Sequence, residues 1–78
     1  MTTTPDPTGE PIAETAHYAD GQLKYSGCKV DGAFHGEWTF YRADGSVMRI
    51  GAFDRGRQIG VWRTYDRAGA VVKETTFT

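Results

Sequence analysis

The sequence has a single cysteine, Cys28, and lacks any long apolar run. One cysteine cannot form a disulfide within the chain, which fits a reducing compartment. No segment is long and apolar enough for a signal peptide or a membrane-spanning helix. The expected location is therefore the cytoplasm.

Apolar residues are also scarce at the N-terminal end. All three prolines lie within residues 1–11, together with threonines and a glycine. Such a segment cannot bury enough surface to offset the entropy lost on ordering, so we expect a flexible tail at 1–11. Residues 12–78 then form one domain, which is small enough that a compact core would be marginal.

The net charge is only −1, but the two halves of the chain differ in sign. Residues 1–40 carry two lysines and six acidic residues, a net −4, whereas residues 41–78 carry six arginines and one lysine against four acidic residues, a net +3. This division could attract an acidic partner or let copies of the chain meet head to tail. Alternatively, the long arginine side chains only keep a thin sheet soluble.

A 24-residue repeat runs through residues 17–78 without a gap. It gives units at 17–40 and 41–64 and a partial unit at 65–78. The recurring residues are mainly glycine and tryptophan: Gly21 with Gly45 and Gly69, Gly27 with Gly51, and Trp38 with Trp62. A fixed period in this range is typical of stacked supersecondary units.

Each unit has the pattern of a β-hairpin followed by a return loop. Aromatic and β-branched residues mark strands, and glycines after aspartate or alanine mark tight turns. The predicted strands are 12–18, 22–30, 36–42, 46–54, 60–66 and 70–77, with loops opening at Asp31-Gly32 and Arg55-Gly56. The predicted fold is all-β: an elongated, twisted antiparallel meander of about six strands, with no helical periodicity.

Two glycines, Gly27 and Gly51, fall inside predicted strands, where glycine costs roughly 0.5–1 kcal/mol relative to alanine. A glycine that recurs within a strand indicates close approach of another group. The simplest candidate is the indole of Trp38 or Trp62 lying over the bare backbone.

The repeat follows a recognisable order: a turn Asp-Gly, an apolar residue two positions on, a glycine, an aromatic two positions later, then Gly-x-Trp-x-x-Tyr. Over residues 17–77 this pattern resembles the MORN-repeat variant of the bacterial YwqK antitoxin-like family. Tyr41 and Tyr65 match its last tyrosine. Lys29 departs from it, because an aromatic is expected there as at Phe53, and Phe34 is a candidate to fill that gap. The resemblance implies an elongated twisted sheet used for protein–protein contact and suggests an antitoxin-like role.

Catalytic residues are scarce. The one cluster resembling a nucleophile with a base is Cys28, Asp31 and His35, and the second unit has Ala52, Arg55 and Ile59 in these places. We interpret it as a half-buried thiol beside a solvent-facing loop rather than an active site.

Cofactor and metal motifs are equally scarce. Cys28, His35 and His17 have no metal-ligand spacing, and no phosphate-binding glycine motif is present. We expect neither an enzyme nor a cofactor or metal.

Anionic ligands are the main alternative to a protein partner. The segment Trp62-Arg63-Thr64-Tyr65 could stack single-stranded bases, although its aromatics also suit the interior of the sheet. A net charge of −1 is far from the basic character of most nucleic-acid-binding domains. Acidic lipid headgroups would need a denser basic cluster. Binding of nucleic acid or acidic lipid headgroups through the arginine-bearing C-terminal half consequently ranks second, after binding of a protein.

Apolar residues on both faces of one predicted strand favour an interaction module. Alternation along 47–54 puts Val47, Arg49, Gly51 and Phe53 on one face and Met48, Ile50 and Ala52 on the other. Either the sheet curls over itself, or the second face meets another chain.

We hypothesise a non-catalytic protein-interaction surface made of Met48, Arg49, Ile50, Arg55, Arg57 and Arg63. The repeated glycines and tryptophans would hold the scaffold. The expected partner is another protein, such as a cognate toxin, an assembly subunit or a second copy of the chain. Nucleic acid and membranes are not expected partners.

Overall fold

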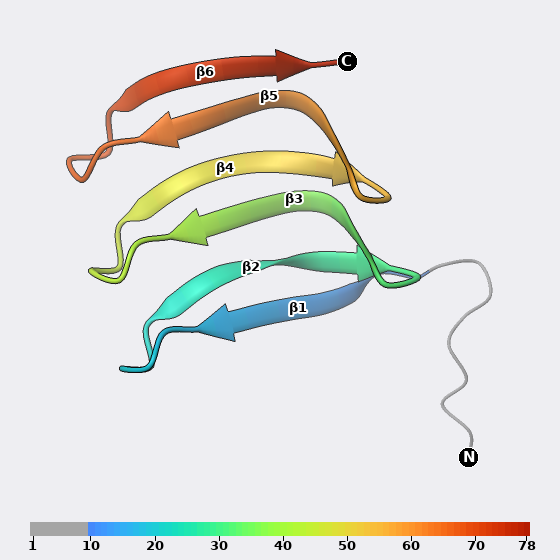
Figure 1. Ribbon diagram of the computed structural model, residues 1–78, viewed down its shortest axis with the longest axis horizontal. Coiled ribbons are helices and arrows are strands. Elements are labelled where there is room, and N and C mark those ends of the chain that lie inside the picture. The colour runs from blue at the N-terminus through green and yellow to red at the C-terminus, as the bar shows by residue number, and fades with distance from the viewer. Residues whose placement is uncertain (1–9) are drawn as a thin grey trace.

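The computed structural model describes residues 10–78, which form one six-stranded sheet (Figure 1). The strands are β1 (Ile12–His17), β2 (Leu23–Val30), β3 (Ala33–Tyr41), β4 (Val47–Asp54), β5 (Arg57–Tyr65) and β6 (Val71–Phe77). Each strand is antiparallel to the next, in the order of the sequence, and these residues contain no helix. The predicted all-β meander is confirmed. The tail predicted at 1–11 lies outside the described residues, except for Glu10 and Pro11, which belong to no strand.

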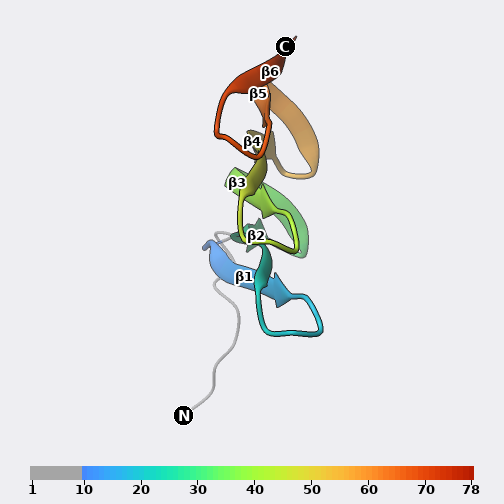
Figure 2. The ribbon, with the colours of Figure 1, turned by 90° about the vertical axis from the view of Figure 1, so that its left-hand side faces the viewer.

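The sheet is a single twisted layer, as the edge-on view shows (Figure 2). Its extents are 47 × 36 × 12 Å, and the shortest is close to the thickness of one sheet with its side chains. Among the described residues, the buried hydrophobic side chains are Val30, Trp38 and Trp62. A second layer that would cover either face is therefore missing from residues 10–78.

At one end of the sheet, three hairpin turns share a glycine with positive φ. Gly21, Gly45 and Gly69 have φ of 92°, 91° and 91°, a conformation that costs glycine little because it has no Cβ. In the first two turns an aspartate accepts a hydrogen bond from the amide two residues on, as Asp44 Oδ1 does from Ser46 at 2.9 Å. The third turn has Ala68 in that place, and Asp66 takes over the role from two positions earlier.

At the other end, the chain turns more tightly than the sequence analysis predicted. Asp31 and Gly32 have φ of 51° and 83°, and Arg55 and Gly56 repeat this with 50° and 93°. Two successive positive φ values define a two-residue turn that suits the twist of a hairpin. The strands β3 and β5 therefore begin directly after these turns, and the predicted return loops and the strand starts at 36 and 60 were wrong.

The error comes from a bulge inside β3 and another inside β5. Ser26 pairs with Thr39 and Cys28 with His35, so Gly27 alone faces three residues, 36–38. The pairing of β4 with β5 repeats the arrangement around Gly51. The glycines at 36 and 60 have φ of 78° and 72°, which suits a bulge inside a strand. The sequence pattern predicts that these glycines start strands. Instead, they lie inside strands that have already begun and kink them.

The bulges place each tryptophan over a glycine of the preceding strand, as predicted. A Cβ added to Gly27 would overlap the indole of Trp38, and one added to Gly51 would overlap the indole of Trp62. The Trp38 Nε1 donates a hydrogen bond to the carbonyl oxygen of Cys28 at 3.0 Å, and Trp62 does the same to Ala52 at 3.2 Å. We call each such arrangement a tryptophan–glycine lock.

Seven of the ten aromatic side chains gather on one side of the sheet, which we call the aromatic face. Its rings, linked by centroid distances of 4.0–6.2 Å, belong to Tyr25, Phe34, Trp38, Phe40, Phe53, Trp62 and Phe77. Phe34 stacks on Trp38 at 4.0 Å and carries the Lys29 ammonium 5.5 Å above its ring. Phe34 thus fills the gap left by the lysine, as expected. The row of rings is the core of the molecule.

Candidate interaction surfaces

The side opposite the aromatic rings, which we call the opposite face, has no aromatic row to cover it. Alternation from the registered pairs puts Thr39, Ile50 and Arg63 on this face, directly across from one another on β3, β4 and β5. Ala52 and Ile59 form the next pair along the same two strands. The opposite face therefore carries apolar residues in the middle of the sheet.

A shallow hollow of about 300 Å³ lies on the opposite face near the aspartate turns. Its apolar part comes from Val47, Ile50 and Tyr65, and its rim from Ser46, Asp66, Arg67 and Gly69. Ile50 and Tyr65 are half-buried by their neighbours in the sheet, and no second layer of residues 10–78 lies over them. An apolar floor with a polar rim is the usual composition of a protein-binding patch.

The hypothesised partner surface divides between the two faces. Arg49 pairs with Phe40, and its guanidinium carbon lies 5.9 Å from the ring centroids of Phe40 and Trp62, so Arg49 belongs to the aromatic face. Ile50 belongs to the opposite face. A set containing both residues cannot form one contact surface.

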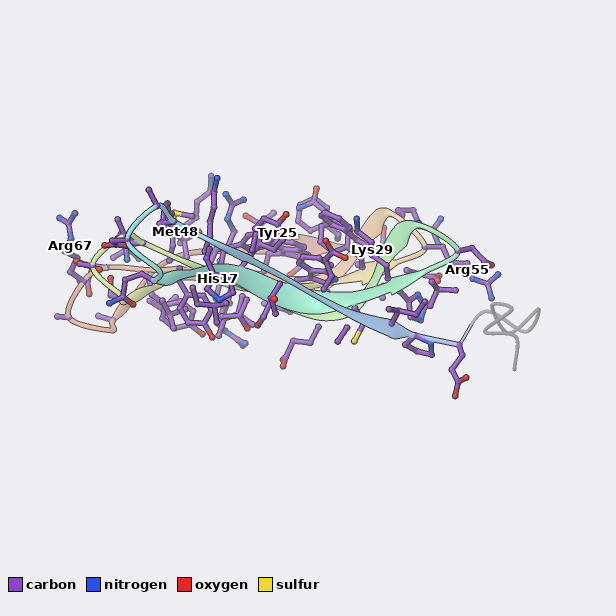
Figure 3. The ribbon with its side chains drawn as sticks, turned by 90° about the horizontal axis from the view of Figure 1, so that it is seen from below. His17, Tyr25, Lys29, Met48, Arg55 and Arg67 are labelled. Atoms are coloured by element: carbon purple, nitrogen blue, oxygen red, sulfur yellow. The ribbon has the colours of Figure 1, made fainter. Side chains whose placement is uncertain are left out.

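Met48 also lies on the wrong side for the hypothesis. Phe40 pairs with Arg49 but Tyr41 pairs with Val47, so Met48 is the extra residue of a bulge. Figure 3 shows Met48 on the same side of the sheet as Tyr25 and Lys29, and His17 on the other. The alternation predicted for 47–54 was wrong at 47 and 48, because one inserted residue reverses the faces before it.

The three remaining arginines of the hypothesis are not clustered. Arg63 forms an ion pair with Glu74 at 2.7 Å on the opposite face, and Arg57 lies 3.7 Å from Asp54 at the far end of the same strand. Arg55 is an exposed turn residue. These positions do not make a continuous basic patch.

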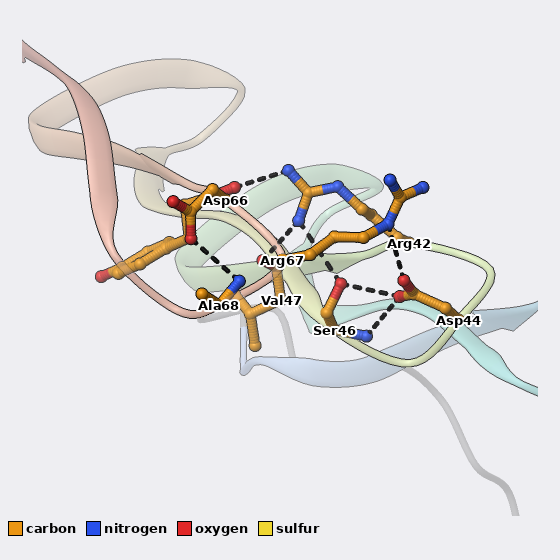
Figure 4. A network of polar contacts seen from close by, with 8 residues as sticks. Arg42, Asp44, Ser46, Val47, Asp66, Arg67 and Ala68 are labelled. Atoms are coloured by element: carbon orange, nitrogen blue, oxygen red, sulfur yellow. Dashed lines mark hydrogen bonds and ion pairs between the residues drawn. The ribbon is translucent and has the colours of Figure 1, made fainter.

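Polar contacts link successive turns along one edge of the molecule (Figure 4). Arg42 donates to the carbonyl oxygen of Val47 at 3.0 Å and also to that of Tyr65 in the next unit. Tyr18, 24 residues earlier, makes the equivalent bond through its hydroxyl, to Tyr41 at 2.8 Å. Neither link can be recognised in the sequence, because the equivalent positions hold different residue types, Tyr18 and Arg42.

Asp44 is the titratable group most affected by these contacts. It accepts hydrogen bonds from the Ser46 hydroxyl at 2.7 Å and from the Ser46 amide, and Arg67 lies 2.8 Å away. The two Ser46 bonds, and then Arg67, stabilise the ionised carboxylate and lower its pKa to about 2.

The cluster of Cys28, Asp31 and His35 is only partly brought together. Cys28 pairs directly with His35 across β2 and β3, but Asp31 lies in the turn. His35 Nδ1 accepts the Arg55 amide at 3.2 Å and lies 3.9 Å from Asp54 Oδ1. Within residues 10–78, no three His, Cys, Asp or Glu side chains lie close enough to hold a metal.

A second hollow, of about 290 Å³, lies on the aromatic face towards β6. Arg49 and Lys73 supply its positive charge, and Gln58, Thr64 and Thr75 supply neutral polar groups beside Trp62 and Phe77. Its lining contains no carboxylate. We call it the basic hollow.

The exposed large hydrophobic residues lie mainly on the two outer strands. Ile12 on β1 is 62% exposed, and Val71 and Val72 on β6 are 49% and 62% exposed. Both outer strands also present one row of backbone groups that the sheet does not pair.

Comparisons with protein-family models, curated proteins and solved structures found no match. Among residues 10–78, no helix could cross a membrane.

Proposed function

We propose that this protein is a non-catalytic protein-interaction module that binds its partner through the hollow around Ile50 on the opposite face. The observation that carries the proposal is the asymmetry of a one-layer sheet. Its aromatic face packs rings on one another, whereas the apolar residues of the opposite face lie under no second layer of residues 10–78. Covering them with another chain removes apolar surface from water, which is the main driving force of association.

The residues around the hollow favour a protein as the ligand. The rim contains Asp66 as well as Arg67, and Arg67 is already paired with Asp44, so the rim carries both signs of charge rather than one. A rim of mixed charge suits the polar edge of a protein interface better than a polyanion. The resemblance to the YwqK antitoxin-like family supports the same class of partner and makes a cognate toxin or an assembly subunit the first candidate.

The test compares one charge placed on each face. Immobilised wild-type protein, Ile50→Glu and Gln58→Glu are used to capture proteins from native lysate, and the captured proteins are quantified by mass spectrometry. Gln58 pairs with Phe53 and lies on the aromatic face, so it is the matched control. We expect a protein that binds the wild type and Gln58→Glu but is lost with Ile50→Glu, in variants whose circular dichroism is unchanged. Equal capture by Ile50→Glu would contradict the proposal.

A second function, binding of an anionic ligand, is favoured by the basic hollow alone. Arg49 and Lys73 lie beside two aromatic rings there, an arrangement that suits stacked bases or acidic headgroups. Binding to oligonucleotides or to vesicles with acidic lipids would then weaken steeply with salt. Arg49→Ala with Lys73→Ala should abolish it and leave the Ile50 surface intact.

A further inference from the structure

A tryptophan–glycine lock needs a tryptophan, a bulge glycine two residues before it and a facing glycine on the neighbouring strand. The outer strands lack all three. At the position 24 residues before Trp38, β1 has Glu14, and in place of the bulge glycine it has Ile12. At the position of the facing glycine, β6 has Thr75. A strand that pairs with β6 therefore needs no bulge, and Thr75 meets no indole if that strand is β1. The outer edges fit a regular antiparallel junction.

We propose that β6 pairs with β1 of a second copy of the chain, head to tail, which continues the sheet from one molecule to the next. In the register that keeps the faces of the sheet continuous, Lys73 lies opposite Ala16, Thr75 opposite Glu14, and Phe77 opposite Ile12 of the second copy. The pairs in between join Glu74 to Thr15 and Thr76 to Ala13. Five of the six residues of β1, Ile12 to Ala16, take part.

The backbone groups of both edges suit this register. At the last hairpin the Asp66 amide donates a hydrogen bond to the carbonyl oxygen of Ala70, and at the first the Tyr18 amide donates one to the carbonyl oxygen of Gln22. Hydrogen-bonded residues alternate along an antiparallel ladder, so on β5 Thr64, Trp62 and Gly60 face β6 as Asp66 does. They pair with Lys73, Thr75 and Phe77, so the outward groups of β6 are those of Glu74 and Thr76. By the same alternation, the outward groups of β1 are those of Ala13 and Thr15. The proposed register brings these two sets directly opposite each other.

The side chains are complementary as well. Phe77 and Ile12, on the aromatic face, would meet at one end of the junction, where Ile12 is otherwise 62% exposed. The Glu14 carboxylate, which lies 3.8 Å from the Lys29 ammonium of its own chain, would lie across from Thr75, one of the residues that line the basic hollow with Lys73 and Arg49. Opposite charges at facing or diagonal positions stabilise a strand pair. The net −4 of residues 1–40 and +3 of residues 41–78 favour the same head-to-tail approach.

This junction goes beyond the proposed function and uses a different surface. It involves the strand edges and the basic hollow, whereas partner binding was assigned to the opposite face around Ile50. A result that contradicts the head-to-tail junction therefore does not contradict partner binding around Ile50, and the reverse also holds.

The test uses two variants that each reverse one charge of the junction. Glu14→Lys leaves a chain with lysine at both 14 and 73, and Lys73→Glu leaves one with glutamate at both. Sedimentation velocity is measured from micromolar to millimolar protein for the wild type, for each variant, and for an equimolar mixture. Glu10→Lys and Lys24→Glu, which change charge equally outside the junction, are the controls.

We expect the wild type and both controls to assemble as concentration rises. Each variant alone should need roughly tenfold more protein to reach the same mass, because opposite charges have become like charges. The mixture should recover the wild-type assembly, since every junction between a Glu14→Lys chain and a Lys73→Glu chain again joins opposite charges. A wild type that stays monomeric at millimolar concentration would overturn the proposal, and so would a mixture that assembles no better than its components. Thermal unfolding shows that each variant is folded.

Discussion

The inner junctions of this sheet and its outer edges are built on different principles. At the junctions of β2 with β3 and of β4 with β5, a bulge lets a tryptophan lie over a bare glycine, and the tryptophan is 0% or 5% exposed. At the outer edges the equivalent positions hold Glu14 and Thr75, and nothing is locked. A one-layer sheet is thus stabilised by repeated side-chain contacts along one face rather than by a core enclosed between two layers. Its edges and its uncovered face remain available for partners.

The largest effect should follow from breaking a lock. Trp62→Ala removes a nearly buried indole and should lower the free energy of unfolding by about 3–5 kcal/mol. Trp38→Ala should cost at least as much, because Phe34 also stacks on that indole. The measurement is urea denaturation followed by circular dichroism. At the outer edge, Glu14→Ala is the control and should change stability by less than about 0.5 kcal/mol. A small loss for Trp62→Ala would show that the indole is a surface binding residue.

A smaller effect should come from filling the space beneath a tryptophan. The Cβ of Gly51→Ala would overlap the rings of Trp62, which cannot move without opening the sheet, so we expect a loss of about 1–3 kcal/mol. The edge offers the reverse change. Thr75→Gly should cost only the roughly 0.5–1 kcal/mol that glycine costs in a strand. Equal stability of Gly51→Ala and the wild type by denaturation would contradict the lock.

The two junctions that have a lock, β2 with β3 and β4 with β5, differ in which strand supplies the phenylalanine. In the first, Lys29 faces Phe34, and in the second, Phe53 faces Gln58. Phe34→Gln should therefore destabilise the first junction by about 1–3 kcal/mol. Adding Lys29→Phe should recover at least half of that loss, because it gives the first junction the residues of the second. Non-additivity in a double-mutant cycle measures the recovery, and additive losses would mean that the two arrangements are not interchangeable.

The smallest expected effect is on the pH dependence of stability, through Asp44 in the second hairpin turn. The pKa of Asp44 is lowered to about 2 in the folded chain from an ordinary 3.8. A lowered pKa means that the stabilisation is complete above about pH 4 and is lost as pH falls through about 2. A carboxyl titration by NMR should give the low value in the wild type, and Ser46→Ala should raise it. An ordinary value in both proteins would show that the contacts do not persist in solution.

The sequence predicted the repeat, the aspartate turns and the tryptophans over Gly27 and Gly51, because a fixed period and an in-strand glycine have few physical explanations. It did not predict where β3 and β5 begin or which face Met48 takes. A bulge adds a residue without any change in composition, so counting by twos fails across it. Asp31-Gly32 did carry a usable signal, since Asp-Gly between two strand-like runs is typical of a two-residue hairpin turn.

The candidate surface was less predictable than the fold. Alternation along 47–54 predicts the correct side for Ile50, but the arginines of the hypothesis are near it only in sequence, and neighbours in a strand point to opposite faces. The ion pairs of Arg63 with Glu74 and of Arg67 with Asp44 depend on cross-strand and cross-turn register. The pairing register of these strands cannot be predicted from the sequence, because each bulge shifts it.

Residue-resolved amide hydrogen exchange at low protein concentration tests the central claim most directly, because it reports the stability of each strand separately. We expect the slowest exchange in β3, β4 and β5 around the two locks, and much faster exchange in β1 and β6. Protection of β1 and β6 equal to that of the inner strands, in a molecule shown to be monomeric, would contradict it.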